Sequence, residues 1–163
     1  MIKLIIYILI TFFLDNLFNN IEITNILFPH LVVSSLIIIF ILLKDNKKFI
    51  LLTLILGFIY DILYNNIPYS IFIFLMLGVV IISINKLFKI NLINICFLTI
   101  IIIFIYNFLI FLISVIYLNN NYVVIDFLTK FKNSILLNII YNTLSYLIFC
   151  HNKSNTLSKK RLT

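Results

Sequence analysis

The stretch LINICFLTIIIIFIYNFLIFLISVIYL, residues 92–118, contains no charged residue. At a rise of about 1.5 Å per residue, an α-helix over this stretch is about 40 Å long, whereas the hydrocarbon core of a bilayer is about 30 Å thick. Its apolar residues also lack the alternation at every second position that a membrane β-strand requires. The stretch therefore predicts a transmembrane helix that tilts or projects beyond the membrane.

The rest of the chain has the same character. It is 64% hydrophobic and only 10% charged, whereas soluble domains are about 25% charged. Apolar runs long enough for helical membrane spans occur at 2–18, 26–43, 49–64, 69–84, 92–118 and 134–150. The sequence therefore predicts an all-α polytopic membrane protein. We expect one domain of six transmembrane helices over 1–151, followed by a short basic cytoplasmic tail over 152–163.

The basic residues predict the orientation, because Lys and Arg are retained on the cytoplasmic side of a membrane. Ten of the 12 Lys and Arg lie in alternate segments, and only Lys130 and Lys132 lie on the other side. We therefore expect a multi-pass protein of the bacterial cytoplasmic membrane with both termini in the cytoplasm and with 19–25, 65–68 and 119–133 outside. The basic residues would also attract anionic lipid. Because they lie in short loops and a tail, no nucleic-acid surface is expected.

The last outer segment has an amphipathic pattern. Its apolar residues, Val123, Val124, Phe127, Leu128 and Phe131, share one helical face. Its polar residues, Asp126, Thr129, Lys130 and Asn133, share another. This pattern predicts a short helix that lies in the outer membrane interface. An irregular loop with a few membrane-dipping side chains is the alternative.

Two ionisable residues lie inside predicted spans, where their high cost makes them candidates for a function. Asp15 lies about one turn from the outer end of the first span, and Asp61 about one turn from the outer end of the third. They form either a paired polar site at the outer mouth or two hydrogen-bonded or solvated helix-end residues.

Polar residues also occur in the fifth and last spans. Asn107 lies near the middle of the fifth span and needs a partner helix, because an unpaired buried amide costs a few kcal/mol. In the last span Ser134, Asn138, Tyr141, Asn142 and Ser145 recur at spacings of three and four and form one stripe. Such a stripe holds helices together, or it lines a substrate cavity or a seam with a partner protein. The two glycines, Gly57 and Gly78, are expected at points of close helix approach.

The sequence favours a protein that is not an enzyme. His30 and His151 are predicted at opposite membrane faces, so they cannot share a metal ion. The spacings of HExxH, GxSxG and P-loop motifs do not occur. Cys96 lies inside a span and Cys150 at the end of another, which indicates neither a disulfide framework nor a metal site. We expect no cofactor.

Three segments, in order, resemble one known family. Pro29-His30-Leu31 opens the second span, GFIYDILYNNIPYSIF covers 57–72, and NIIYNTLSYLIF covers 138–149. They resemble the MreD family of bacterial rod-shape-determining membrane proteins. In that family the second span opens with Pro-Asp-Leu, the third carries a Gly-rich stretch ending in Asp-Leu-Leu, and an Asn marks the last helix.

By this resemblance the family's motif residues correspond to Pro29, Gly57, Asp61 and Asn142. His30 stands where the family usually has Asp, and Asn65 and Tyr69 stand where it usually has glycines. A turn that needs a positive φ accepts Asn far more readily than Tyr.

The resemblance implies a non-catalytic scaffold of the cell-wall elongation machinery, which regulates and maintains cell shape. Its partners would be an MreC-like bitopic protein and, through it, the MreB filament, a penicillin-binding transpeptidase and the RodA glycosyltransferase. The family is also similar in fold to the six-helix substrate-binding subunits of energy-coupling-factor vitamin transporters. Such a subunit is the alternative function.

Overall fold

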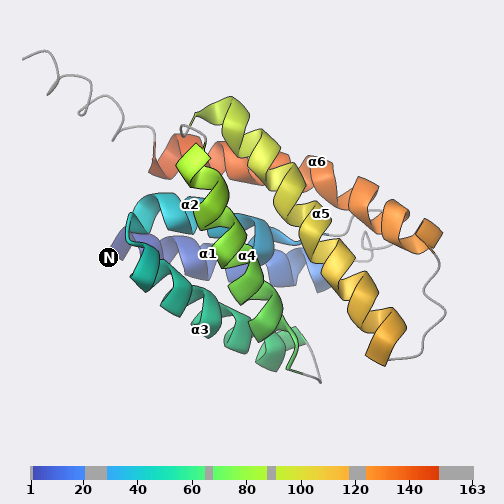
Figure 1. Cartoon of the computed structure of the whole chain (residues 1–163). Helices are drawn as coiled ribbons and strands as arrows, with labels where there is room; N and C mark the ends of the chain where they lie inside the picture. The colour runs from blue at the N-terminus through green and yellow to red at the C-terminus, as the bar shows by residue number, and fades with distance from the viewer. Residues whose placement is uncertain (1, 21–28, 65–67, 88–90, 118–123, 151–163) are drawn as a thin grey trace, which may run out of the picture.

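The computed structural model describes residues 2–20, 29–64, 68–87, 91–117 and 124–150. Within these ranges it contains six helices and no strand (Figure 1): α1 (Ile2–Asn20), α2 (Leu31–Leu43), α3 (Asn46–Tyr64), α4 (Ser70–Leu87), α5 (Leu92–Tyr117) and α6 (Val124–Phe149). Consecutive helices run in alternating directions (Figure 1). The predicted all-α class is confirmed. The predicted tail over 152–163 lies outside the described residues.

The first, third, fourth and fifth helices agree closely with the predicted segments, but α2 and α6 differ. α2 begins only at Leu31, after Pro29, and the predicted residues 26–28 lie outside the described ranges. α6 begins at Val124 and continues without a break to Phe149. The segment ahead of residue 134 is therefore helical from Val124, as predicted, rather than an irregular loop, but the prediction that it is separate from the last helix is wrong.

Aromatic packing explains the early start of α6. The Phe127 ring lies 5.8 Å from the Phe104 ring and 5.8 Å from the Phe111 ring, both on α5. One turn later the Phe131 ring lies 5.4 Å from that of Phe104. Aromatic pairs at such separations stabilise a contact beyond the area they bury. The apolar side chains at Phe127 and Phe131 therefore hold the start of α6 against α5, which favours a continuous helix.

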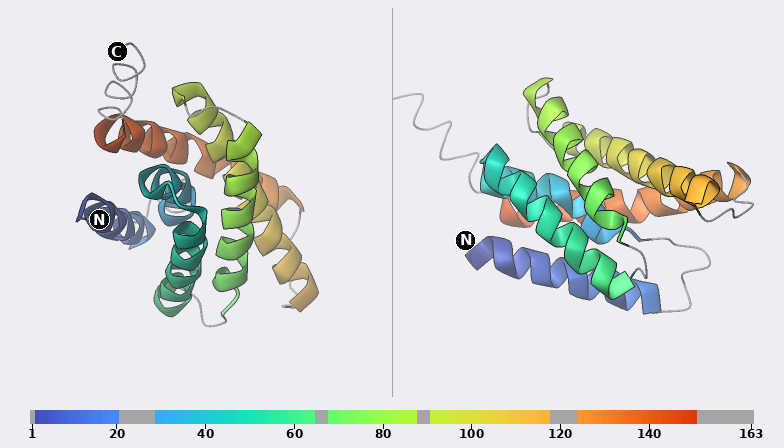
Figure 2. Two further views of the ribbon diagram at one scale, coloured as in Figure 1. Left: turned by 60° about the vertical axis from the view of Figure 1, so that its left-hand side comes forward. Right: turned by 60° about the horizontal axis from the view of Figure 1, so that its bottom comes forward.

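α2 lies at the centre of the bundle. It contacts all five other helices, and Figure 2 shows it between α1, α3 and α6. Every residue from Leu31 to Phe40 is buried. Its two serines donate hydrogen bonds within the helix, Ser34 Oγ to the Leu31 carbonyl and Ser35 Oγ to the Val32 carbonyl. Because it is apolar on all sides, α2 has the pattern of a core helix.

Two of the described helices are long and apolar enough to cross a membrane. They are α1, over Ile2–Asn19, and α5, over Leu92–Ile116. Leu31–Leu43 and Ser70–Lys86 are apolar but shorter. By length and composition, two helices therefore meet the requirement for a membrane span.

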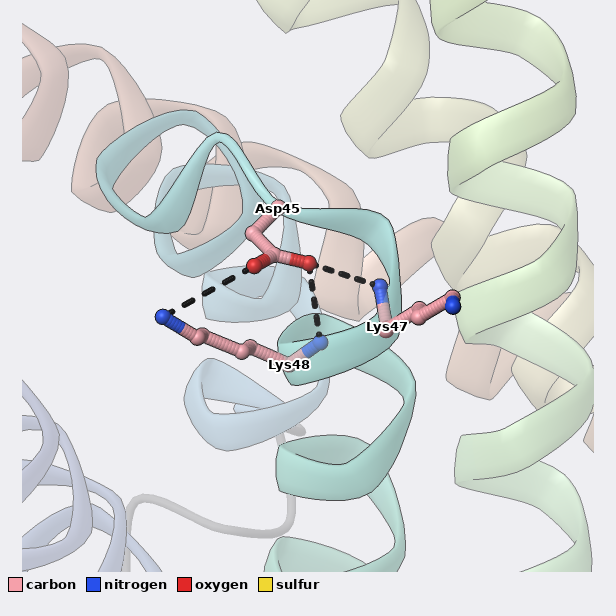
Figure 3. Close-up of polar contacts among 3 residues, drawn as sticks. All are labelled: Asp45, Lys47 and Lys48. Carbon is pink, nitrogen blue, oxygen red and sulfur yellow. Dashed lines mark hydrogen bonds and ion pairs between the residues drawn. The ribbon is translucent and has the colours of Figure 1, made fainter.

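Local capping shapes the turn between α2 and α3. Lys44 ends α2 in the left-handed conformation at φ 56°, and its N–H donates to the Phe40 carbonyl at 3.0 Å. Asp45 Oδ1 then accepts from the N–H groups of Lys47 at 3.0 Å and Lys48 at 3.2 Å (Figure 3). Lys48 Nζ also lies 3.8 Å from Asp45 Oδ2. Asp45 thus supplies the acceptor that the first turn of α3 needs.

Both glycines lie where α3 and α4 approach each other closely. A Cβ atom added at Gly57 would lie 2.8 Å from the Ile71 Cα and 3.0 Å from the Ser70 carbonyl oxygen, both backbone atoms of α4. One added at Gly78 would lie 3.1 Å from the side chain of Thr53 on α3. The contact at Gly57 is therefore set by backbone, and the contact at Gly78 by a side chain.

We expect Gly57→Ala to lower the free energy of unfolding by about 2 kcal/mol, because overpacking against a backbone forces the helices apart. Gly78→Ala is the matched control. The Thr53 side chain can shift, and the gain in helix propensity of up to about 1 kcal/mol offsets the crowding. Thermal unfolding of both variants in mild detergent measures the difference. An equal loss in the two variants would contradict this account of the α3–α4 contact.

Candidate functional site

Asp15 caps the start of a helix other than its own. It lies near the end of α1 and is fully buried, and its Oδ1 accepts a hydrogen bond of 2.7 Å from the Leu31 N–H, the first of α2. His30, the residue ahead of α2, provides no side-chain cap. The first N–H groups of a helix have no partner within it and carry partial positive charge. Asp15 therefore stabilises a helix start that is buried in the bundle.

Asp61 does the same for α4. From α3, its Oδ1 accepts from the Ser70 N–H at 3.0 Å and its Oδ2 from the Ile71 N–H at 3.1 Å. Gly57 lies one turn earlier on α3 and touches the same two residues of α4. The absence of a side chain at Gly57 lets the helices approach closely enough for Asp61 to reach these N–H groups. Gly57 and Asp61 therefore act together at one contact.

The two caps belong to a repeated sequence pattern. DNLFNN over 15–20 matches DILYNN over 61–66, and each is followed by a proline, at Pro29 and Pro68. In both cases the capped N–H belongs to the second residue after that proline. Pro29 follows Asp15 by 14 positions and Pro68 follows Asp61 by only 7. This unequal spacing hides the repeat, and the shared Asp-x-Leu-aromatic-Asn-Asn is the signal that reveals it.

The structure assigns the two aspartates to separate helix starts rather than to one shared pair. Of the two interpretations of Asp15 and Asp61, that of hydrogen-bonded helix-end residues describes their contacts. Pro29 is buried just ahead of α2, where it precedes the helix and deprives it of no hydrogen bond.

Asn142 joins three helices. From α6, its Nδ2 donates to the Ser34 carbonyl of α2 at 3.0 Å and to Thr99 Oγ1 of α5 at 2.9 Å. The side chain is fully buried. Thr99 Oγ1 in turn donates to the Ile95 carbonyl of its own helix at 2.8 Å. Asn142 therefore makes the interhelical contact expected of the polar stripe and is not available to a partner protein at the surface.

The rest of the stripe also faces inward. Ser134, Asn138 and Ser145 are buried. Asn138 Nδ2 donates only to the Ser134 carbonyl of its own helix, at 2.7 Å. The partly buried Tyr141 hydrogen-bonds through its hydroxyl to that of Thr11 on α1, and its ring stacks on that of Tyr7. α1 is thus held to α6 by polar and aromatic contacts.

Asn107 finds no interhelical partner as firm as that of Asn142. It is buried, and its Nδ2 donates to the Ile103 carbonyl of α5 at 2.9 Å. Its side chain also interacts with His30, just ahead of α2. The His30 ring meets the edge of the Tyr106 ring at 4.7 Å. Asn107 therefore lies beside a group of aromatic residues around the start of α2.

This group, the Asp15 cluster, comprises Asp15, His30, Tyr60, Tyr64 and Tyr106, which come from α1, α3, α5 and the residue ahead of α2. The Tyr60 and Tyr64 rings lie 4.6 Å apart, and the Tyr60 hydroxyl interacts with that of Tyr106. Asp15 is within electrostatic reach of all three tyrosines. The sequence indicated Asp15 but not this aromatic surrounding, because these segments meet only in the folded bundle.

The Asp15 cluster contains unpaired polar atoms. Asp15 Oδ2, His30 Nε2 and the Tyr64 hydroxyl are each buried without a hydrogen-bond partner in the structure. The Val32 N–H also lies near the Asp15 carboxylate. Among the described residues no group of three or more His, Cys, Asp or Glu could hold a metal ion. His151 lies outside them.

We expect Asn142→Leu to lower the free energy of unfolding by about 1 kcal/mol, because it removes two hydrogen bonds between helices at about 0.6 kcal/mol each. Asn138→Leu is the matched control, one turn away and equally buried. It removes only a hydrogen bond within α6, so the loss should be about half as large. Thermal unfolding in detergent compares the two, and a larger effect at Asn138 would contradict the role of Asn142.

Comparison with known proteins provides no relative from which a function can be transferred. No family model, no curated protein and no solved structure matches this chain. The function proposed below therefore rests on the residues and contacts described above and on the resemblance of the three sequence segments.

Proposed function

We propose that this chain is a polytopic protein of the bacterial cytoplasmic membrane, with six spans. The observation that carries this proposal is the inverted polarity of α1 and α6. On α1, Tyr7, Thr11 and Asp15 are buried. The exposed residues of α1 include Ile2, Ile5, Ile6, Leu9, Ile10, Phe13 and Leu17. Contiguous apolar surface on this scale is unusual in a soluble monomer and suits a helix that faces lipid.

α6 repeats this inversion although its first turns are charged. Its buried residues are the polar Ser134, Asn138, Asn142 and Ser145, whereas Leu136, Ile140, Leu144, Leu147 and Ile148 are exposed. In a membrane, polar side chains turn toward other helices, where they find hydrogen-bond partners. The short α2 is compatible with a membrane domain because the surrounding helices bury it from Leu31 to Phe40.

The distribution of lysines supports an orientation with both termini in the cytoplasm. With the helices alternating in direction, Lys3, Lys44, Lys47, Lys48 and Lys86 fall at one end of the bundle. The other end has Lys130 and Lys132 on the first turns of α6. By the rule that positive charge stays inside, the first end is cytoplasmic. Its lysines are also placed to attract anionic lipid headgroups.

Within this membrane we propose a non-catalytic scaffold of the cell-wall elongation machinery that helps to maintain cell shape. The four residues that match the MreD pattern support it through their positions. Gly57 and Asp61 hold α3 to α4, Asn142 joins α6 to α2 and α5, and Pro29 precedes α2. These residues maintain the bundle itself, which suits a protein whose outer surface binds partners. The proposed partner is an MreC-like bitopic protein and, through it, MreB, a transpeptidase and RodA.

The topology can be tested by labelling cysteines introduced at the two ends of the bundle. Lys47 and Asp126 are both exposed and lie at opposite ends of the bundle. We expect Asp126→Cys to react with a membrane-impermeant maleimide in intact spheroplasts, and Lys47→Cys to react only after lysis. The unsubstituted chain, which retains Cys96 and Cys150, provides the background. Labelling of Lys47→Cys in intact spheroplasts would contradict the proposed orientation.

The scaffold role can be tested by copurification. We expect the tagged protein, extracted from its native membrane in mild detergent, to bring with it an MreC-like protein, a penicillin-binding transpeptidase or RodA, identified by mass spectrometry. A tagged, unrelated polytopic protein expressed at the same level is the control. Recovery of paired ATPases and a coupling membrane subunit would instead support the vitamin-transporter alternative and overturn the scaffold.

A further inference from the structure

Asp15 and Asp61 cap the following helix in different ways. Both oxygens of Asp61 accept backbone hydrogen bonds, from the N–H groups of Ser70 and Ile71. Asp15 Oδ1 accepts from the Leu31 N–H, but its Oδ2 is buried without a hydrogen-bond partner. Capping therefore uses the whole carboxylate of Asp61 but only one oxygen of Asp15.

No positive charge compensates the Asp15 carboxylate. The titratable groups within its electrostatic reach are tyrosines of three other helices, Tyr60 and Tyr64 of α3, Tyr106 of α5 and Tyr141 of α6. Phenol groups are neutral at physiological pH. Within the described ranges, no Lys side chain interacts with this carboxylate. An ionised Asp15 is therefore an uncompensated buried charge.

Two basic groups near the start of α2 act on each other instead. His30 lies just ahead of α2, and Lys130 lies on the first turns of α6. Lys130 is within electrostatic reach of His30, which also interacts with Asn107. Neither basic group acts on the Asp15 carboxylate. They therefore provide no counter-charge for it.

The balance of charge effects favours a neutral Asp15. The start of α2 attracts negative charge, because a helix N-terminus carries partial positive charge. This attraction is smaller than the cost of taking an unpaired carboxylate out of water. A buried carboxylate without a charged partner avoids that cost by taking up a proton. The neutral carboxyl still accepts from the Leu31 N–H through Oδ1, so the cap of α2 is retained.

We propose that Asp15 is a proton-binding site and that its Oδ2 carries a proton in the folded bundle at neutral pH. Proton binding needs no cavity, because the proton forms part of the carboxyl group itself. Asp15 lies near the end of α1 that faces the outer side in the proposed orientation, so it exchanges its proton with that side. Loss of the proton in an alkaline medium leaves an unpaired charge between α1 and α2 and loosens their contact. This site goes beyond the scaffold role and does not depend on it.

Infrared spectroscopy detects the proton directly. A protonated carboxylic acid has a C=O stretching band that an ionised carboxylate lacks, and an ester-free detergent such as dodecyl maltoside keeps lipid carbonyl bands away. We expect the wild type to show this band at neutral pH and the band to shift when the aspartate carboxyl carbons are labelled with carbon-13. Asp15→Asn should remove the band, and Asp61→Asn should keep it. A labelled wild type without a shifted band, or a band that Asp15→Asn retains, would overturn the proposal.

Thermal unfolding at neutral pH compares the two caps. An amide resembles a protonated carboxyl in shape and charge, so Asp15→Asn should keep the Tm of the wild type. Asp61→Asn is the matched control, because its amide offers a single acceptor oxygen to two N–H groups, and it should lower the Tm. A loss of Tm in Asp15→Asn as large as that in Asp61→Asn, failure to fold included, would contradict a neutral Asp15. The infrared band of the labelled wild type is measured independently of either variant.

The pH dependence of the Tm has a definite sign. A carboxyl that is protonated in the folded chain and ionised in the unfolded chain stabilises the fold less as the pH rises. We therefore expect the Tm of the wild type and of Asp61→Asn to fall from neutral to alkaline pH relative to that of Asp15→Asn, which has no proton to lose. Parallel profiles of the wild type and Asp15→Asn would overturn the proposal while leaving the scaffold role intact.

Discussion

The enclosure of α2 is the constraint on which the other contacts of the bundle depend. Because α2 is buried from Leu31 to Phe40 and touches every other helix, other helices must supply partners for the N–H groups at its start, which have none within the helix. Asp15 supplies an acceptor at its start, and Asn142 donates to the Ser34 carbonyl within it. Hydrogen bonds from α1 and from α6 thus both meet this helix of 13 residues.

The few acidic groups of the chain are used in a consistent way. The carboxylates of all four aspartates lie at the N-terminus of a helix, where negative charge is favourable. Asp45 caps its own helix, Asp15 and Asp61 cap the following helix from the preceding one, and Asp126 lies in the first turn of α6. Since the capping reaches across a hairpin at Asp15 and Asp61, these residues stabilise tertiary structure as well as a helix end. Oδ2 of Asp15 is the exception, because it is buried without a hydrogen-bond partner.

Much of the fold could be predicted from residue order alone, and the errors have physical causes. The helix boundaries at residues 64 and 92 follow from where apolar runs meet Asn. The error at the start of α6 arose because Phe127 and Phe131 have an amphipathic pattern that suits a membrane interface and a neighbouring helix equally well. Only the packing of their rings on Phe104 distinguishes the two.

The sequence by itself determined the helical class, the segregation of lysines and the polar stripe of α6, because these depend on composition and on the 3.6-residue period of a helix. Only the tertiary structure decided which polar group meets which. Asp15 and Asp61 have similar local sequences. Both oxygens of Asp61 accept backbone hydrogen bonds, whereas only one oxygen of Asp15, which lies among tyrosines, does so. That difference depends on which helices surround each carboxylate, and the contacts involved join residues far apart in the chain.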